Sequence, residues 1–274
     1  MQGTALLDSF LGSAPSRRAA GSAPAAGVFF PREHGSWSLV IEPLALGLVI
    51  APSWAGGALT AAVLAVFFAR RPFKAVSIST ATRRREAWAA VALFAVLGIA
   101  GLSIVLVLRG ATSLWPLLPA APLAGLFAWF DTQNGARAGA AETAGSAAFA
   151  LVPAVLATLA GWPAWSALAL AAVALTHSVP TVLAVRACLR RTKGGTGGFL
   201  LPVFVAAGAA LALTALAASH RLPAGAAVPA WGLFARTLWF ADSAPPAWPA
   251  RRIGQLEALL GLAYVGAVAV AYRS

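Results

Sequence analysis

The chain has 274 residues, of which 60% are hydrophobic and only 10% are charged. A typical soluble domain carries about 25% charged residues, so this composition excludes an ordinary cytosolic enzyme and a disordered chain. The remaining class is an all-α polytopic membrane protein, built as a bundle of transmembrane helices. The 20 Lys and Arg residues outnumber the 8 Asp and Glu residues. Because they gather between apolar segments, we interpret them as determinants of membrane topology, and we expect no nucleic-acid partner.

Residues 1–28 are rich in Ala, Gly, Ser and Pro, with Arg17 and Arg18 in the middle. A signal peptide would place positive charge before an apolar core and a cleavage site after it. This region has no basic start, and its apolar run is too short. We therefore expect a disordered tail over residues 1–28 and one transmembrane helical domain over residues 29–274.

Apolar segments recur along the rest of the chain, each ended by Pro, Gly or Arg. Most are close to the roughly 20 residues that a helix needs to cross a bilayer. The first two are short and closely connected, so they form either two full spans or a re-entrant hairpin. The pattern predicts about nine spans, near residues 35–52, 55–70, 86–108, 114–130, 141–160, 164–186, 199–219, 223–240 and 254–272.

Basic residues are concentrated in alternate connections between these segments. The other connections carry little beyond Arg109 and Arg221, and Arg273 lies at the C-terminus. The positive-inside rule then predicts a cytoplasmic N-terminus and an outside C-terminus. The basic connections hold Arg70, Arg71, Lys74, Arg83, Arg84, Arg85, Arg137, Arg186, Arg190, Arg191, Lys193, Arg251 and Arg252.

The densest polar group precedes and enters the first apolar segment. Ionisable side chains at membrane depth are costly and usually face the bundle interior, so each one is a candidate for function. Pro43 removes one backbone hydrogen bond and leaves the carbonyl of Leu39 free, as at a kinked binding site. We predict a polar pocket that opens from the cytoplasmic side. The alternative is an interfacial anchor with one buried and paired glutamate. The group comprises Arg32, Glu33, His34, Trp37 and Glu42.

A second polar group lies on the sixth predicted span. His177 and Thr181 are four residues apart and share a helix face, as do Arg186 and Arg190. Two arginines on one face at a helix end are suited to bind a phosphate, a carboxylate or a lipid headgroup. We retain His177 and Arg186 as candidate ligand-binding residues and interpret the other basic residues of this connection as topological charge.

Two glutamates begin predicted spans, Glu142 the fifth and Glu257 the ninth. Either can pair with an arginine from a neighbouring basic connection, or be stabilised by the positive end of its own helix. We include Glu142 in the candidate pocket. The single cysteine, Cys188, excludes a Cys-based zinc site, and we predict no metal site. The sequence leaves catalytic residues and cofactors unassigned.

Three stretches together resemble the YwiC-like family of bacterial multi-spanning membrane proteins. They are Pro31 to Trp37 followed by Glu42-Pro43, Ala141 to Gly145, and His177 to Ala187. The Glu-His-Gly-x-Trp element is the most distinctive part, and the resemblance runs from about residue 29 to the C-terminus. The resemblance implies a multi-pass protein of the bacterial cytoplasmic (inner) membrane, but it does not imply a particular reaction.

The chain is more distantly similar to the UbiA-type intramembrane prenyltransferases. Those enzymes have nine helices and use Asp-rich motifs in two cytoplasmic loops to hold magnesium and a prenyl diphosphate. The corresponding loops here, 70–85 and 186–198, contain no Asp. Because magnesium prefers oxygen ligands, the resemblance implies a possible UbiA-like fold without the standard metal-dependent mechanism.

The leading description from the sequence is a YwiC-like membrane protein with a cytoplasmic-side polar pocket for an anionic or lipid-linked small molecule. Three classes of function remain open for it. The first is a UbiA-like transferase acting on a lipid-linked substrate, and the second is a proton-coupled small-molecule transporter. The third class is a non-catalytic membrane subunit or assembly factor, which small-residue helix faces would suit. Beyond the lipid bilayer, the sequence names no partner.

Overall fold

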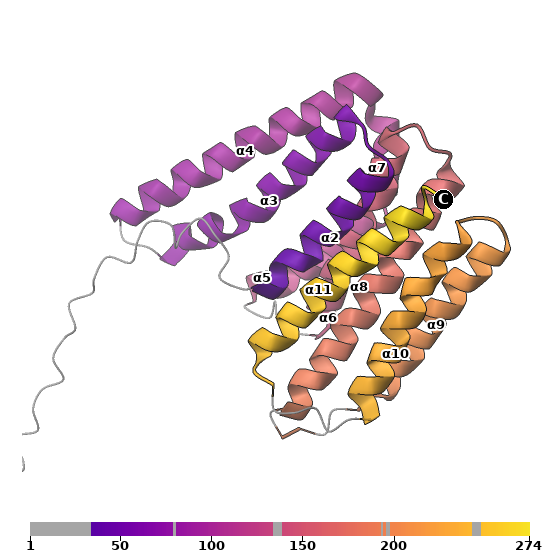
Figure 1. The fold of residues 1–274 in the computed structure, drawn as a ribbon. Helices are drawn as coiled ribbons and strands as arrows, with labels where there is room; N and C mark the ends of the chain where they lie inside the picture. Colours follow the sequence, from indigo (N-terminus) through magenta and orange to yellow (C-terminus); the bar gives the residue numbers. More distant parts are fainter. Residues whose placement is uncertain (1–33, 79–80, 134–138, 193, 196–197, 243–247) are drawn as a thin grey trace, which may run out of the picture.

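The computed structural model describes residues 34–78, 81–133, 139–192, 194–195, 198–242 and 248–274. Every regular element in these ranges is a helix, which confirms the predicted all-α class. The helices form one bundle in which successive helical segments run in roughly opposite directions, with α6 and α7 together as one segment (Figure 1). The predicted tail over residues 1–28 lies outside the described residues.

Each predicted apolar segment coincides with one helix or with two short helices in succession. Three of the segments are each divided into two successive helices, one shorter and one longer. The elements are α2 (His34–Ile50), α3 (Trp54–Ile78), α4 (Ala81–Arg109), η1 (Ala111–Leu117), α5 (Ala120–Thr132), α6 (Gly139–Ala150), α7 (Val152–Leu159), α8 (Ala164–Thr192), α9 (Leu200–Ala218), η2 (Ala224–Ala227), α10 (Val228–Asp242) and α11 (Ala250–Ala271).

Five helical stretches in the described ranges are long and apolar enough to cross a membrane. Two helices bent by 57° at their junction, η1 and α5, give a sixth if they act as one broken span. The membrane class is therefore supported, whereas the predicted count of nine spans is not confirmed. The shortfall has physical reasons: α2 and α10 have only 17 and 15 residues, and α3 carries three basic residues in its last turns. The five stretches are Arg83–Arg109, Gly139–Leu159, Ala164–Thr192, Leu200–Ala218 and Ala250–Ala271.

The basic connections lie at one end of the bundle. Because successive helices alternate in direction, the connections α3–α4, α5–α6, α8–α9 and α10–α11 share one end, the lower end in Figure 1. We call it the basic end, since it carries most of the Lys and Arg residues. The opposite end, where the C-terminus lies, carries Arg109, Arg221 and Arg273.

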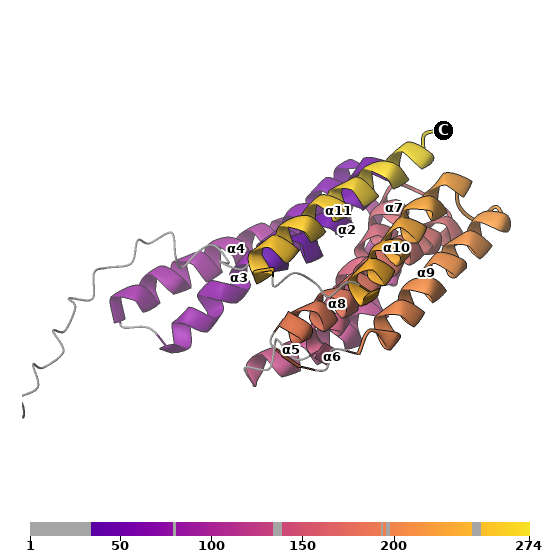
Figure 2. The ribbon, with the colours of Figure 1, turned by 60° about the horizontal axis from the view of Figure 1, so that its bottom comes forward.

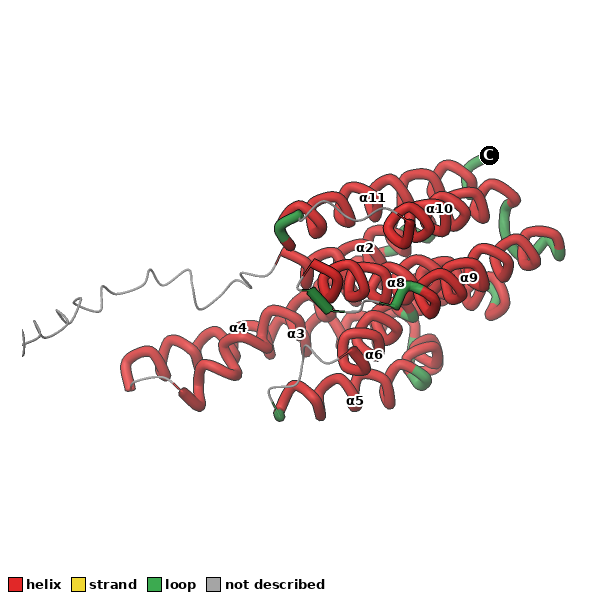
Figure 3. Tube along the Cα trace, turned by 90° about the horizontal axis from the view of Figure 1, so that it is seen from below, coloured by secondary structure: helices red, strands yellow, loops and turns green. Residues whose placement is uncertain are grey.

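The helices lie in three approximate rows when the bundle is viewed from below (Figure 3). The middle row contains α2, α8 and α9, with α10 and α11 on one side and α3 to α6 on the other. Helices α2 and α8 are thus covered on both sides, and they contact α11 as well as α6. This central position buries polar side chains that point from them.

Small residues allow the helices to approach closely. Ala154, Ala167 and Ala210 are fully buried in the central core, which also contains Leu170 and Val173 of α8. Between α3 and α4, a Cβ atom at Gly101 would lie 2.6 Å from the carbonyl oxygen of Ala58, so this position needs glycine. Packing of small residues is the usual means of close helix contact in lipid. The α3–α4 hairpin leans away from the rest of the bundle toward the basic end (Figure 2).

Candidate functional site

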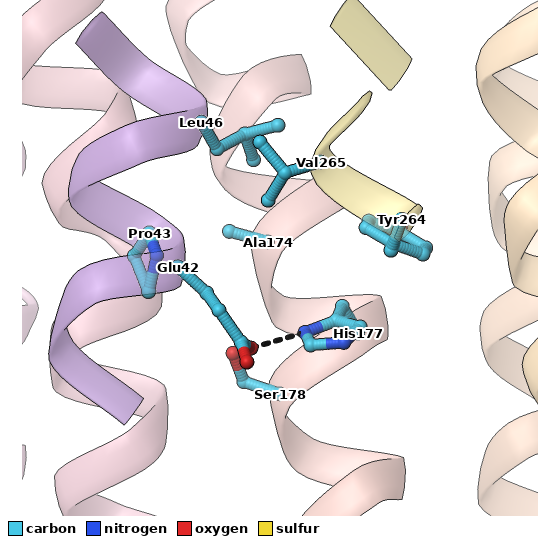
Figure 4. A pocket seen from close by; sticks show the side chains of 8 residues that line it. All are labelled: Glu42, Pro43, Leu46, Ala174, His177, Ser178, Tyr264 and Val265. Carbon is cyan, nitrogen blue, oxygen red and sulfur yellow. Dashed lines mark ion pairs between the residues drawn. The ribbon is translucent and has the colours of Figure 1, made fainter. Parts of the chain in front are cut away.

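A small cavity lies where α2, α8 and α11 meet. Its volume is about 10 Å³. This is barely enough for one water molecule, so the cavity suits a proton relay and not an organic ligand. The lining side chains converge from three helices that are far apart in the sequence (Figure 4). They are Glu42, Pro43 and Leu46 of α2, Ala174, His177 and Ser178 of α8, and Tyr264 and Val265 of α11.

Glu42 and His177 face each other across this cavity. Glu42 Oε2 lies 3.5 Å from His177 Nδ1 (Figure 4), and the two side chains are 11% and 7% exposed. Each residue lies close to a proline inside its helix, Pro43 in α2 and Pro180 in α8. A proline within a helix removes one backbone bond and bends the helix, which opens space for polar groups. The structure thus brings together one residue from each polar group of the sequence.

Helix α11 closes the third side of this pair. The ring of Tyr264 lies 4.5 Å from the ring of His177, and its hydroxyl donates a hydrogen bond of 2.9 Å to the carbonyl oxygen of Val173. One turn earlier on α11, a Cβ atom at Gly261 would overlap the Glu42 carboxylate. Only glycine lets the carboxylate reach its observed position, because any side chain at 261 would occupy that space. The sequence analysis missed both α11 residues, since neither is charged.

A second ion pair lies deep in the bundle between α10 and α11. Arg236 Nη1 lies 3.2 Å from Glu257 Oε1, and the two side chains are 6% and 8% exposed. Arg236 Nη2 also donates a hydrogen bond of 3.1 Å to Thr181 Oγ1. The sequence analysis considered Glu257 as a helix-start residue or as the partner of an arginine from a basic connection, and it overlooked Arg236. Its position inside the predicted span 223–240 was the signal that should have marked it, because an arginine inside an apolar span is costly.

The two ion pairs are adjacent along the bundle axis. On α8, Thr181 follows His177 by one turn, and on the antiparallel α11, Glu257 precedes Gly261 by one turn. Arg236 is close enough to act electrostatically on His177, and Glu257 on Glu42. We call Glu42, His177, Arg236 and Glu257 the buried charged cluster. Within it, the Arg236–Glu257 pair lies one turn nearer the basic end.

Glu142 and Arg186 form a third pair, apart from the cavity. Arg186 Nη1 lies 2.5 Å from Glu142 Oε2, and the side chains are 27% and 32% exposed. Gly139 lies beneath the guanidinium, where a Cβ atom would be 3.3 Å from Arg186 Nε. Pairing of Glu142 with an arginine of a basic connection was one of the two expected arrangements. The predicted single pocket is therefore divided between the buried charged cluster and this half-buried pair.

The remaining predicted site residues do not line the cavity. Arg32 and Glu33 lie outside the described residues, and His34 begins α2 with a side chain that is not described. Trp37 packs in an aromatic cluster, with ring centroids 6.3 Å from Phe67 and 5.3 Å from Phe68. Across the described ranges, no group of three or more His, Cys, Asp or Glu residues is arranged to hold a metal ion.

The chain was compared with known families, curated proteins and solved structures. Residues 30–156 match the model of a family described as YwiC-like protein. This region includes α2 to α6 and the first part of α7, and hence Glu42 and Glu142, whereas His177 and the Arg236–Glu257 pair lie beyond it. No curated protein and no solved structure matches the chain, and the likeness to UbiA-type enzymes stays a prediction. The match supports the resemblance seen in the sequence: residues 30–156 are similar to the YwiC-like family.

Proposed function

We propose that this chain is a proton-coupled membrane transporter of a small solute, in which Glu42 and His177 bind the transported proton. The observation that carries the proposal is the contact between a carboxylate and an imidazole, 3.5 Å apart and both buried between α2 and α8. Ionisable residues inside a membrane bundle commonly mark ion and proton pathways. The small cavity beside this pair suits the passage of a proton.

Proton exchange at this pair changes the force between two helices. A charged Glu42 and a protonated His177 attract each other strongly in a region of low dielectric constant. Loss or gain of one proton removes that attraction and leaves one charge without its partner. Because Pro43 and Pro180 each remove a backbone hydrogen bond from these two helices, we expect α2 and α8 to move relative to each other when the proton leaves. Such a movement is the step that alternating access requires.

The orientation that we propose follows from the charge distribution. The basic end gathers most of the Lys and Arg residues, and such ends usually face the cytoplasm. The protein would then lie in the bacterial inner membrane with its N-terminus cytoplasmic and its C-terminus outside. The Arg236–Glu257 pair would lie on the cytoplasmic side of the Glu42–His177 pair.

Proton movement in liposomes tests this function. The purified full chain is reconstituted into vesicles that contain a pH-sensitive dye, and lactate, alanine or glucose is added outside. We expect at least one solute to drive proton entry in the wild type. Glu42→Gln should abolish this entry and His177→Asn should reduce it strongly, because each removes a proton-binding group.

The control is Glu86→Gln, which changes an exposed carboxylate on α4 in the same way. This variant should behave as the wild type. Proton entry that survives Glu42→Gln contradicts the proposal, as does the absence of any solute-dependent entry across the panel.

A second candidate function is supported by Arg186. Its guanidinium is 27% exposed, lies at the basic end and is paired with Glu142 above a glycine. An accessible arginine in such a place is suited to hold a lipid-linked phosphate, as a UbiA-like transferase would require. Binding of labelled farnesyl diphosphate to the purified protein, with and without magnesium, tests this candidate. Saturable binding that Arg186→Ala removes supports it, and no binding at micromolar ligand eliminates it.

A further inference from the structure

The guanidinium of Arg236 is buried but only partly hydrogen-bonded. One hydrogen bond runs from Nη2 to Thr181, and the ion pair with Glu257 is a single contact of 3.2 Å. Among the described residues, Nε and Nη1 of Arg236 have no hydrogen-bond acceptor, and Glu257 Oε1 has no donor. Buried polar groups are nearly always satisfied, and an unsatisfied donor in a charged group is especially costly. The site therefore has binding capacity that Glu257 alone does not use.

The chemistry of arginine indicates what the additional partner would be. A guanidinium presents a planar fork of N–H donors that matches a carboxylate in a two-bond arrangement. Glu257 supplies a carboxylate but makes only one contact in this position. A carboxylate on a mobile ligand has the same charge and can adopt the two-bond geometry freely. A small organic carboxylate is thus the natural competitor of Glu257 for Arg236.

We propose that Arg236 binds the carboxylate group of the transported solute, and that Glu257 accepts a proton and no longer pairs with Arg236. This inference rests on the proposed function, since it names the class of solute that moves with the proton. The solute is a small organic carboxylate. The Arg236–Glu257 pair, where it binds, lies on the side of the cavity that is nearer the basic end.

The exchange balances in charge and in atoms. Before binding, the positive guanidinium is paired with the negative Glu257. After binding, the guanidinium is paired with the solute carboxylate, and one proton has formed an O–H bond on Glu257. One proton is thus taken up for each carboxylate bound, and the net charge of the buried cluster stays the same. Charge conservation matters because an uncompensated charge inside a membrane is strongly disfavoured.

The groups around Glu257 support a local proton source. Arg236 from α10 acts electrostatically on Glu257, and Glu257 in turn acts on Glu42 from α2 and on Cys188 from α8. Glu42 is also in contact with His177, so a proton held by this pair lies about one helical turn from Glu257. The Glu42–His177 pair passes its proton to Glu257 and takes up one proton from the aqueous side in its place. One proton thus enters for each carboxylate bound, and the net charge of the buried charged cluster with its ligand is unchanged.

Binding of radiolabelled lactate, pyruvate and succinate to the purified full chain tests the inference. We expect saturable binding of at least one of them to the wild type. The double variant Arg236→Gln/Glu257→Gln should lose binding but stay folded, because a neutral pair of similar size often replaces a buried ion pair without loss of stability. Glu257→Gln should bind about tenfold more tightly, since its internal competitor is gone, and should lose solute-driven proton entry.

Two controls make the result specific. Arg109→Gln removes an exposed arginine at the opposite end and should leave binding unchanged. Gel filtration of each variant verifies that the protein is folded. Replacing neutral lipid with phosphatidylglycerol tests the other source of an anionic group: stabilisation that depends on Arg236 and on this lipid, with no carboxylate bound, would overturn the inference.

The outcomes separate this inference from the proposed function. Carboxylate binding that survives the double variant, or no binding of any of the three acids, overturns the Arg236 site. If a different solute then drives Glu42-dependent proton entry, the proposed function still stands. Arg236-dependent binding without proton entry contradicts the proposed function and the exchange step with it.

Discussion

Helices α4 and α8 have the same length, 29 residues, but very different surroundings. Only 11% of the most apolar window of α4 is buried inside the protein, compared with 56% of that of α8. The charged residues of α4 are confined to its two ends, whereas α8 carries His177 and Ser178 buried near its middle. A helix that faces lipid has no face packed inside the protein on which to place a polar side chain. Polar residues that could function therefore lie on helices that other helices surround.

The largest effect should come from breaking a buried ion pair. Arg236→Met leaves Glu257 without its partner inside the bundle, and we expect a loss of about 3–5 kcal/mol in the free energy of unfolding. Arg186→Met, which breaks the half-exposed pair with Glu142, should cost at most about 1 kcal/mol because solvent screens that pair. Thermal unfolding of both variants in detergent measures the difference. Equal losses would mean that the depth of the Arg236–Glu257 pair has no energetic consequence.

Matched leucines test the difference in burial between the two helices directly. Leu170 of α8 is fully buried, whereas Leu93 of α4 is 55% exposed and contacts lipid in a membrane. Leu170→Ala should destabilise the protein by about 2–5 kcal/mol, since it leaves a cavity in a packed core. Leu93→Ala should change stability by less than about 1 kcal/mol, because lipid or detergent fills the vacated space. Denaturation midpoints of the two variants in the same detergent provide the comparison. A large loss at Leu93 would indicate that α4 packs against another protein surface.

Two glycines on α11 test the close approach of Glu42. A Cβ atom at Gly261 would overlap the Glu42 carboxylate, whereas Gly266 has nothing within 4 Å of such an atom. Gly261→Ala should force the carboxylate away from His177, lower stability by about 1–3 kcal/mol and reduce solute-driven proton entry. Gly266→Ala should be neutral or should stabilise α11 by up to about 1 kcal/mol. Normal proton entry in Gly261→Ala would mean that the observed position of Glu42 is not needed for function.

The sequence predicted the helices well because their signal is local. Long apolar segments bounded by Pro, Gly and Arg coincide with the helices of the structure, and basic connections alternate as expected. The number of spans was harder to predict, because helices such as α2 and α10, with 17 and 15 residues, lie at or below the lower limit of length for a span. Hydrophobicity marks where a helix forms, but helix length and burial decide whether it spans.

The candidate site was only half predictable, because its partners lie far apart in the sequence. Glu42 and His177 were each recognised as intramembrane ionisable residues, but their contact depends on the packing of α2 against α8. Arg236 was missed because attention went to clusters of polar residues, and it lies alone among apolar neighbours. Conversely, Trp37 was grouped with the polar residues beside it, although its ring belongs to the aromatic cluster with Phe67 and Phe68. Proximity in sequence is a poor guide to a site assembled from four helices.

We expect the smallest effect from removal of the Tyr264 hydroxyl. This change distinguishes the contribution of the hydroxyl from that of the aromatic ring. Tyr264→Phe keeps the ring beside His177 and removes the hydrogen bond of 2.9 Å to the Val173 carbonyl. We expect a loss of about 0.5–1.5 kcal/mol in the free energy of unfolding, with proton entry largely retained, because the hydroxyl holds α11 to α8 and takes no part in the Glu42–His177 contact. Thermal unfolding and dye-monitored proton entry are measured on the same preparation. If proton entry falls as far as it does in His177→Asn while stability is unchanged, then the hydroxyl belongs to the proton path, and the buried charged cluster must be extended to include Tyr264.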